Sequence, residues 1–322
     1  MELKDKINIF KNEGIEKIKI ISDFDGTFTK QYKNKDTREN NSVSVFRNEN
    51  YLSEVYSNGA KKLFEKYNKY ERDSSLSKGK KTKLMEQWWT EHWALMQKEN
   101  MNESNVLEVI SKKQIKLRSG VEKFVKISNR LKIPLFIFSS GTGNLIEEYL
   151  ISKQINFSNV KIISNLWKFD EKGKFIGLRN KYIIHSQNKD VSLLQKWFSE
   201  SNNNSECLID TNISYFDSIK KKKNVILIGD SVHDVRMCQK YDNIIKIGFI
   251  SKHLGKDKKK EFDEQFDLVI DDEKGFEKII KLLNEIYSND KKSSFGFSLF
   301  NKLLKKKVEN EFKFEKIVPN YF

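Results

Sequence analysis

Six short apolar segments recur along the chain, each bounded by polar residues. They occupy residues 17–21, 133–139, 160–165, 225–230, 244–250 and 266–270. Continuous apolar runs of this length are typical of strands that are covered on both faces. Between most of them apolar residues recur at helical spacing, as in 121–131 and 145–151. The alternation predicts an α/β fold, in which a doubly wound parallel sheet carries helices on both faces.

The long stretch between the first two predicted strands does not continue this alternation. Residues 52–67 and 83–98 are expected to form amphipathic helices, separated by the polar, glycine-containing ERDSSLSKGKK. A helical insertion after the first strand lies over the carboxyl end of that strand, where such sheets bind ligands. We therefore predict a catalytic core from residues 1–32 and 119–287, with residues 33–118 inserted as a helical cap.

Two further segments are expected to lie outside the core. Residues 199–223 are polar and asparagine-rich, which predicts a flexible insertion loop. Residues 288–322 form a basic tail in which SLFNKLLKKKVENEF has an apolar helical face. The tail is a candidate contact for a partner or a membrane surface, although we favour packing against its own domain.

Composition argues against nucleic-acid-binding, disulfide-rich, secreted and membrane-spanning proteins. The net charge is +15, but the lysines occur in scattered short runs with acidic residues among them, so we expect no nucleic-acid partner. Cys207 and Cys238 suggest neither a disulfide framework nor a zinc site. The amino terminus is charged throughout, unlike a secretory signal, and no apolar run approaches the roughly 20 residues that span a bilayer. We expect a soluble, cytoplasmic monomer.

Polar residues follow several predicted strands at the point where each strand ends. Asp23 and Asp25 repel each other unless a metal, a shared proton or solvent is present. The carboxyl ends of parallel strands meet at one edge of the sheet, so these residues are expected to converge. The motifs are DFDGT with Asp23 and Asp25, FSSG with Ser139, Ser140 and Gly141, Lys189 downstream of the third strand, and GDSVHD with Asp230 and Asp234.

These four motifs resemble those of the haloacid dehalogenase superfamily. The surrounding stretches FIFSSGTGNLIEEYL, IISNLWKFDEKGKFIG and IHSQNKD look like the cytosolic pyrimidine 5′-nucleotidase family, of the cytosolic 5′-nucleotidase III type. The resemblance covers about residues 17–287 and is weakest in the cap. It implies a haloacid dehalogenase fold and a Mg²⁺-dependent enzyme that hydrolyses pyrimidine nucleoside 5′-monophosphates through an aspartyl phosphate, with phosphotransfer as a side reaction.

The resemblance also implies a role for each motif residue. Asp23 is the nucleophile and Asp25 the acid and base, while Ser139 and Lys189 complete the catalytic set. Lys189 and Ser139, with the amides of Ser140 and Gly141, bind the phosphate. The expected metal ligands are Asp23, Asp25 through its main-chain carbonyl, Asp230 and Asp234, of which Asp234 has the alternative of orienting Lys189.

The cap segment MEQWWTEHW is expected to bind the nucleoside. Trp88 and Trp89 are candidates for stacking on a base, with ordinary core packing as the alternative. The family usually has a glutamate where this chain has Gln87, with Glu86 beside it, so the base preference stays open.

Two alternative functions also fit the sequence. One is a phosphatase for 7-methylguanosine monophosphate or another small metabolite, and the other is a non-catalytic module that binds nucleic acid or membrane. The intact carboxylates and Lys189 argue against the second.

Overall fold

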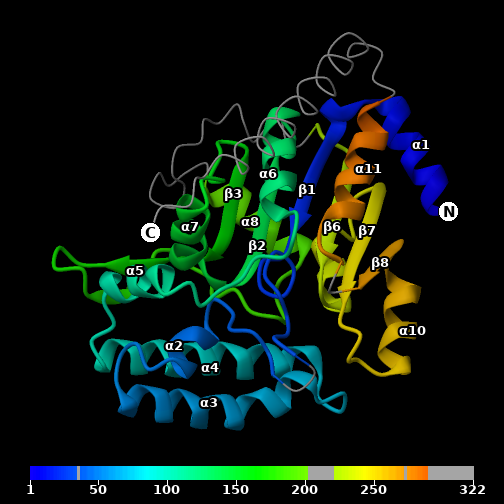
Figure 1. Cartoon of the computed structure of the whole chain (residues 1–322). Coiled ribbons are helices and arrows are strands. Elements are labelled where there is room, and N and C mark those ends of the chain that lie inside the picture. Colours follow the sequence, from blue (N-terminus) through cyan, green and yellow to red (C-terminus); the bar gives the residue numbers. More distant parts are fainter. Residues whose placement is uncertain (35–36, 202–220, 272–273, 289–322) are drawn as a thin grey trace, which may run out of the picture.

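The computed structural model describes residues 1–34, 37–201, 221–271 and 274–288. Its centre is a six-stranded sheet with the order β3-β2-β1-β6-β7-β8, in which every neighbouring pair is parallel (Figure 1). This arrangement confirms the predicted α/β fold. The strands are β1 (Ile18–Ser22), β2 (Leu135–Thr142), β3 (Val160–Asn165), β6 (Asn224–Gly229), β7 (Asn243–Ile250) and β8 (Leu268–Asp271).

Helices cover both faces of this sheet because successive side chains of each strand point to opposite faces. Ile20 belongs to one buried apolar cluster and its neighbour Ile21 to the other. The Ile20 face is covered by α1 (Leu3–Glu13), α6 (Val121–Arg130), α7 (Gly143–Ser152) and α11 (Glu277–Tyr287). The Ile21 face is covered by α8 (Val191–Ser201), the 3-10 helix η3 (Val232–Met237) and α10 (Lys256–Gln265).

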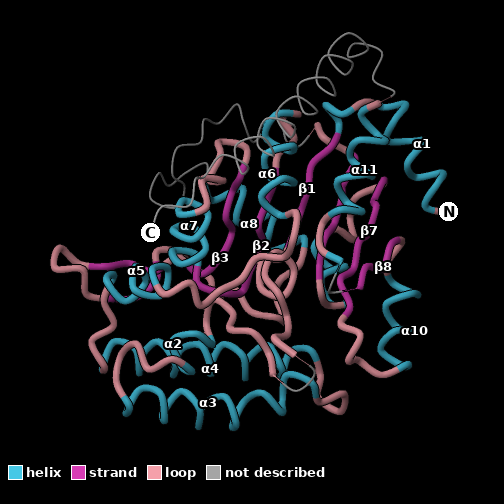
Figure 2. Tube along the Cα trace, viewed as in Figure 1, coloured by secondary structure: helices cyan, strands magenta, loops and turns pink. Residues whose placement is uncertain are grey.

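A second layer of helices lies at the carboxyl ends of the central strands (Figures 1 and 2). It contains α2 (Ser44–Asn48), α3 (Glu54–Arg72) and α4 (Lys78–Lys98), and the following α5 (Glu103–Ser111) lies beside α7 of the core. Ser53 and Ser77 cap the starts of α3 and α4 by accepting a hydrogen bond from a main-chain N–H. The two long cap helices predicted from the sequence correspond to α3 and α4, and the limits proposed for the cap domain stay a prediction.

The chain crosses between the two layers along paired linkers. The N–H of Lys30 donates to the carbonyl of Lys116 at 2.9 Å, and the N–H of Arg118 donates to the carbonyl of Phe28 at 2.8 Å. A hairpin that the sequence did not predict forms a further link, through β4 (Trp167–Phe169) and β5 (Phe175–Leu178). Its Phe175 N–H donates to the carbonyl of Met101 at 2.8 Å, so the hairpin joins the core to the start of α5.

Two of the predicted segments lie largely outside the described residues. These are residues 202–220 of the expected insertion loop and 289–322 of the expected tail. None of the helices in the described part of the chain combines the length and apolar character that a membrane crossing requires.

Candidate active site

Three carboxylates meet at the carboxyl ends of β1 and β6. These two strands pair in parallel, with Ser22 opposite Ile228, so the residues that follow them emerge side by side. Asp23, Asp230 and Asp234 each offer an oxygen, and these oxygens lie within 4.8 Å of one another. Carboxylate oxygens are the ligands that hard divalent cations prefer, so this group could hold such a cation.

Lys189 lies between two members of this group. Its Nζ is 2.8 Å from Asp23 Oδ2 and 2.8 Å from Asp234 Oδ1. Burial alone would lower the pKa of Lys189, but the charges of Asp23 and Asp234 outweigh it and raise that pKa above its ordinary value. The lysine therefore carries a fixed positive charge at the site.

Asp234 is held from the other side by the main chain. Its Oδ2 accepts hydrogen bonds from the N–H groups of Asp230 at 3.1 Å and Ser231 at 3.0 Å, at the start of η3. Both of its oxygens therefore have protein partners. These contacts fit the alternative in which Asp234 orients Lys189.

The carboxylates carry more negative charge than Lys189 neutralises. Burial, followed by the charge of Asp234, raises the pKa of Asp230 to about 6. The pKa of Asp23 is also raised, mainly by burial, although Lys189 opposes the rise. Gln31 Nε2 donates to Asp230 Oδ2, which adds a polar contact but no charge. A bound cation would relieve this imbalance.

The carboxyl group of Asp25 has different partners from that of Asp23. Asp25 Oδ1 accepts from the N–H of Ser42 at 2.9 Å, and Oδ2 is hydrogen-bonded to Ser42 Oγ at 2.5 Å. The turn after Asp25 needs a glycine, because Gly26 has a φ of 77° and a Cβ there would lie 2.3 Å from Asp230 Oδ2. The two aspartates of DFDGT therefore serve two distinct parts of one site.

The end of β2 lies beside Asp25. Ser139 Oγ accepts from the N–H of Gly141 at 3.0 Å, and a Cβ on Gly141 would lie 2.7 Å from Asp25 Oδ2. The carbonyl of Ser140 accepts from Asn165 Nδ2 at 2.9 Å. The structure thus brings the predicted core residues of all four motifs to one edge of the sheet.

Three residues at this edge were not predicted from the sequence. They are Gln31, Ser42 and Arg118, and Arg118 donates from Nη2 to the carbonyl of Gly26 and from Nε to that of Thr27, the latter at 2.9 Å. All three belong to the linkers between the two layers. Their approach depends on the path of the chain, and they carry no recognisable motif.

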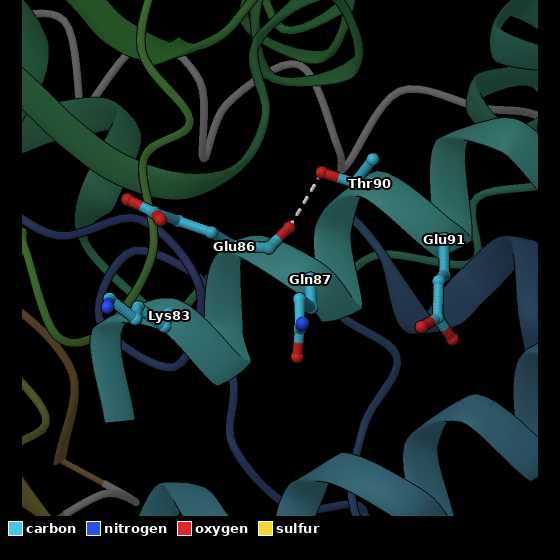
Figure 3. A pocket seen from close by; sticks show the side chains of 5 residues that line it. All are labelled: Lys83, Glu86, Gln87, Thr90 and Glu91. Carbon is cyan, nitrogen blue, oxygen red and sulfur yellow. Dashed lines mark hydrogen bonds between the residues drawn. The ribbon is translucent and has the colours of Figure 1, made fainter. Parts of the chain in front are cut away.

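The predicted substrate residues of the cap lie on α4. A hollow of about 350 Å³ on this helix is lined by Lys83, Glu86, Gln87, Thr90 and Glu91. Figure 3 shows Glu86 extending toward the core side of α4, while Gln87 and Glu91 point to the other side. Glu91 Oε1 accepts from Tyr67 Oη on α3 at 2.6 Å, so the Glu91 side chain reaches α3.

The tryptophans of α4 form a row within the cap. Trp88 stacks on Tyr67 with ring centroids 6.1 Å apart, and Trp89 lies next to both Trp88 and Trp93. Trp93 is buried in the apolar core. At the start of the same helix, Lys78 Nζ lies 3.5 Å from Asp190 Oδ2, next to Lys189. The start of α4 therefore lies near Lys189, at the edge of the sheet where the four motifs converge, which is called the catalytic edge from here on.

Known proteins resemble this chain over most of its length. A family model described as pyrimidine 5′-nucleotidase (UMPH-1) matches residues 26–287. The chain is 33% identical over 267 residues to the 7-methylguanosine phosphate-specific 5′-nucleotidase A of Xenopus laevis, covering 82% of this chain and 84% of the relative. It is 30% identical to the enzyme of that specificity from Drosophila melanogaster, covering 84% and 81% of the two chains.

A comparison with solved structures gives the same family. The crystal structure of cytosolic 5′-nucleotidase IIIB bound to cytidine has a TM-score of 0.71 and 28% identity, covering 90% of this chain and 92% of that one. A haloacid dehalogenase family hydrolase from Salmonella enterica, with a TM-score of 0.51 and 15% identity over 83% and 71% of the chains, shares the fold. Together with the converging motifs, these matches show that the chain belongs to the pyrimidine 5′-nucleotidase family and is a phosphoric monoester hydrolase of the 5′-nucleotidase class.

Proposed function

We propose that this 5′-nucleotidase depends on Mg²⁺ and works through an aspartyl phosphate on Asp23. The observation that carries the proposal is the placement of Lys189 between Asp23 and Asp234, with the carboxylate of Asp230 beside them. A phosphate monoester is an anion, so attack on it by a carboxylate requires positive charge close by. Lys189 supplies one such charge to the nucleophile and to the phosphoryl oxygens.

The excess of carboxylates fits a divalent cation at the same place. Asp23, Asp230 and the main-chain carbonyl of Asp25 would hold Mg²⁺, which would neutralise the phosphoryl charge. The fit rests on the oxygen-only ligands and on the raised pKa values of Asp23 and Asp230. Asp234, with both oxygens already engaged, would orient Lys189.

The reaction proceeds in two displacements at phosphorus. A carboxylate oxygen of Asp23 attacks, the bond between phosphorus and the 5′ oxygen breaks, and Asp25 donates a proton to the departing oxygen. Asp25 then takes a proton from water, whose oxygen attacks the phosphorus of the aspartyl phosphate. Inorganic phosphate leaves and Asp23 is regenerated. Ser139 and the amides of Ser140 and Gly141 would bind the phosphate oxygens in both steps.

For the base we propose a ring that presents an exocyclic amine. Glu86 extends toward the core side of α4, and a carboxylate accepts hydrogen bonds but cannot donate them when ionised. Cytosine offers such an amine and uracil offers a carbonyl at the same place. The names of the relatives and the bound cytidine of the solved structure make CMP and 7-methylguanosine monophosphate the two substrates to test first.

The first experiment tests the nucleophile. Asp23→Asn is expected to abolish phosphate release in the presence of Mg²⁺ while the chain remains folded, as judged by circular dichroism. Activity that survives this change would refute the proposed mechanism. EDTA is expected to abolish the wild-type activity and added Mg²⁺ to restore it.

A second experiment tests the substrate. CMP, UMP, 7-methylguanosine monophosphate and serine phosphate are compared by kcat/KM, and equal turnover of serine phosphate and CMP would end the nucleotide proposal. Glu86→Gln should lower kcat/KM for CMP and Gln87→Ala should not. Trp89→Ala should raise KM for a nucleotide far more than for a small aryl phosphate, and comparable losses on both would indicate a structural tryptophan.

The cellular place of the reaction is also a proposal. The word cytosolic in the names of a Caenorhabditis elegans relative and of the cytidine-bound structure supports a cytoplasmic location. That the chain acts as a monomer stays a prediction.

A further inference from the structure

Ser42 makes three hydrogen bonds at the catalytic edge, although it lies in the linker that leads into the cap. Its N–H donates to Asp25 Oδ1 at 2.9 Å, and its Oγ is 2.5 Å from Asp25 Oδ2. The same Oγ lies 3.2 Å from the main-chain nitrogen of Thr142. One residue thus contacts both oxygens of the aspartate and the end of β2.

The direction of these bonds follows from the groups involved. The main-chain N–H of Thr142 can only donate, so Ser42 Oγ accepts from it. The single hydroxyl hydrogen of Ser42 is then available to Asp25 Oδ2. With its two oxygens fixed by one residue, the Asp25 carboxyl group cannot rotate without breaking a hydrogen bond.

The linker around Ser42 is itself held firmly. Asn41 Oδ1 accepts from the N–H groups of Val43 and Ser44, which folds the chain into a tight turn at the start of α2. Asn40 Nδ2 donates to Glu49 Oε1 at 2.6 Å. The position of Ser42 is therefore also held by contacts on the cap side of the linker, independently of Asp25.

Contact with residues 139–141 at the end of β2, called the phosphate loop from here on, is equally close. A Cβ on Gly141 would lie 1.9 Å from Ser42 Oγ, which means that no other residue fits between the linker and this loop without a shift. Ser42, Asp25 and the end of β2 consequently form one packed, hydrogen-bonded unit.

We propose that Ser42 is a positioning residue for Asp25. It aims the carboxyl group at the leaving oxygen, and it does so only while the cap linker is seated on the phosphate loop. This inference rests on the proposed function, because it assumes that Asp25 delivers the proton to the leaving group. Entry of the cap linker into the site thereby becomes a condition for efficient proton transfer.

The test compares a substrate that needs a proton on its leaving group with one that does not. CMP releases an alkoxide-like 5′ oxygen, whereas p-nitrophenyl phosphate releases a stabilised phenolate. Ser42→Ala should lower kcat and kcat/KM for CMP by about 10- to 100-fold and change KM by less than about 2-fold. The loss of kcat/KM for p-nitrophenyl phosphate should stay below about 3-fold, since misplacement of an acid matters little there.

Ser44→Ala is the matched control. Ser44 Oγ accepts from the N–H of Asn41 in the same turn, so this variant disturbs the linker without removing a contact to Asp25. Both substrates should change by about the same factor in it. If Ser42→Ala does not fold, Ser42→Gly removes the same hydroxyl and keeps the main-chain N–H for the same comparison.

Two further results distinguish a failure of the Ser42 positioning role from a failure of the acid role proposed for Asp25. Equal losses of kcat/KM on both substrates in the Ser42 variant, or a loss confined to KM, would overturn the positioning role. Asp25→Asn is compared by the rate of the first release of the leaving group, because Asp25 is also the base of the second displacement, which both substrates share. This rate should fall by about 10²- to 10⁴-fold for CMP and far less for p-nitrophenyl phosphate. If it falls equally for both substrates, Asp25 is not the acid and the proposed function itself fails at this step.

Discussion

Removal of the Lys189 ammonium tests how the catalytic edge balances its charge. Lys189→Met keeps most of the side-chain volume and deletes two contacts of 2.8 Å, to Asp23 and Asp234. The side chain of Lys189 is 8% exposed and that of Asp234 is 2% exposed, so water cannot replace the lost charge. Breaking a buried ion pair from one side usually costs about 3–5 kcal/mol.

The loss should be visible as a lower melting temperature. For a chain of this size about 3–5 kcal/mol corresponds to a fall of about 4–8 °C. Phosphate release should also fall by about 10³-fold, since the fixed charge beside the nucleophile is gone. Added Mg²⁺ should restore part of the melting temperature but not the activity, because a cation among the carboxylates relieves the same repulsion.

Lys78→Met is the control for loss of a lysine near the site. Lys78 is 61% exposed and lies 3.5 Å from Asp190, so its exposed pair should contribute less than about 1 kcal/mol. Differential scanning calorimetry at pH 7 with EDTA measures both variants. A melting temperature for Lys189→Met within about 2 °C of the wild type would refute the charge argument.

Three further predictions concern the metal, the phosphate loop and the cap. The pKa of Asp230 rises from 3.8 to about 6 on folding, so the folded chain binds a proton between these pH values that the unfolded chain does not. Asp230→Asn should therefore raise the melting temperature of the metal-free protein more at pH 7 than at pH 5, because the other titrating groups, such as His92 and His185, are common to both proteins. Saturating Mg²⁺ should remove that gain. Gly141→Ala should lower kcat by about 100-fold or more, measured with CMP, because its Cβ would lie 1.9 Å from Ser42 Oγ. Trp93→Ala should lower the free energy of unfolding in urea by about 3–5 kcal/mol, and the half-buried Trp88→Ala should cost clearly less.

The fold could be predicted from the sequence because the strands of a covered parallel sheet leave a strong pattern. All six residues of β6 are buried, so the strand is a continuous apolar run with no competing helical period. The β4–β5 hairpin leaves no such pattern. It is short, and its buried Trp167 packs on Phe175 of the same hairpin and on Phe46 of α2, which is distant in the sequence.

The candidate site was predictable to the extent that strand ends determine it. Asp23 and Asp230 follow neighbouring parallel strands, so their approach is a consequence of topology alone. Ser42 and Gln31 reach the same edge through linkers whose course depends on cap packing. No motif indicated a partner for the Asp25 carboxyl group, which meets Ser42 in the structure while Asp23 meets Lys189.

The apolar pattern of α4 is enough to place Glu86 and Gln87 on different sides of the helix. The buried residues Met85, His92, Trp93 and Met96 define one stripe of this helix. With about 100° per residue, Gln87 falls nearly opposite the stripe and Glu86 falls on its flank. Glu91 follows Gln87 by four residues, so the two side chains share one side of the helix. Figure 3 shows Glu86 extending toward the core and Gln87 pointing to the other side, so Glu86 is the better candidate for the proposed contact with the base. If kcat/KM for CMP falls in Glu86→Gln and not in Gln87→Ala, the direction in which the helix presents each side chain, and not the alignment with the family glutamate, selects the residue that contacts the base.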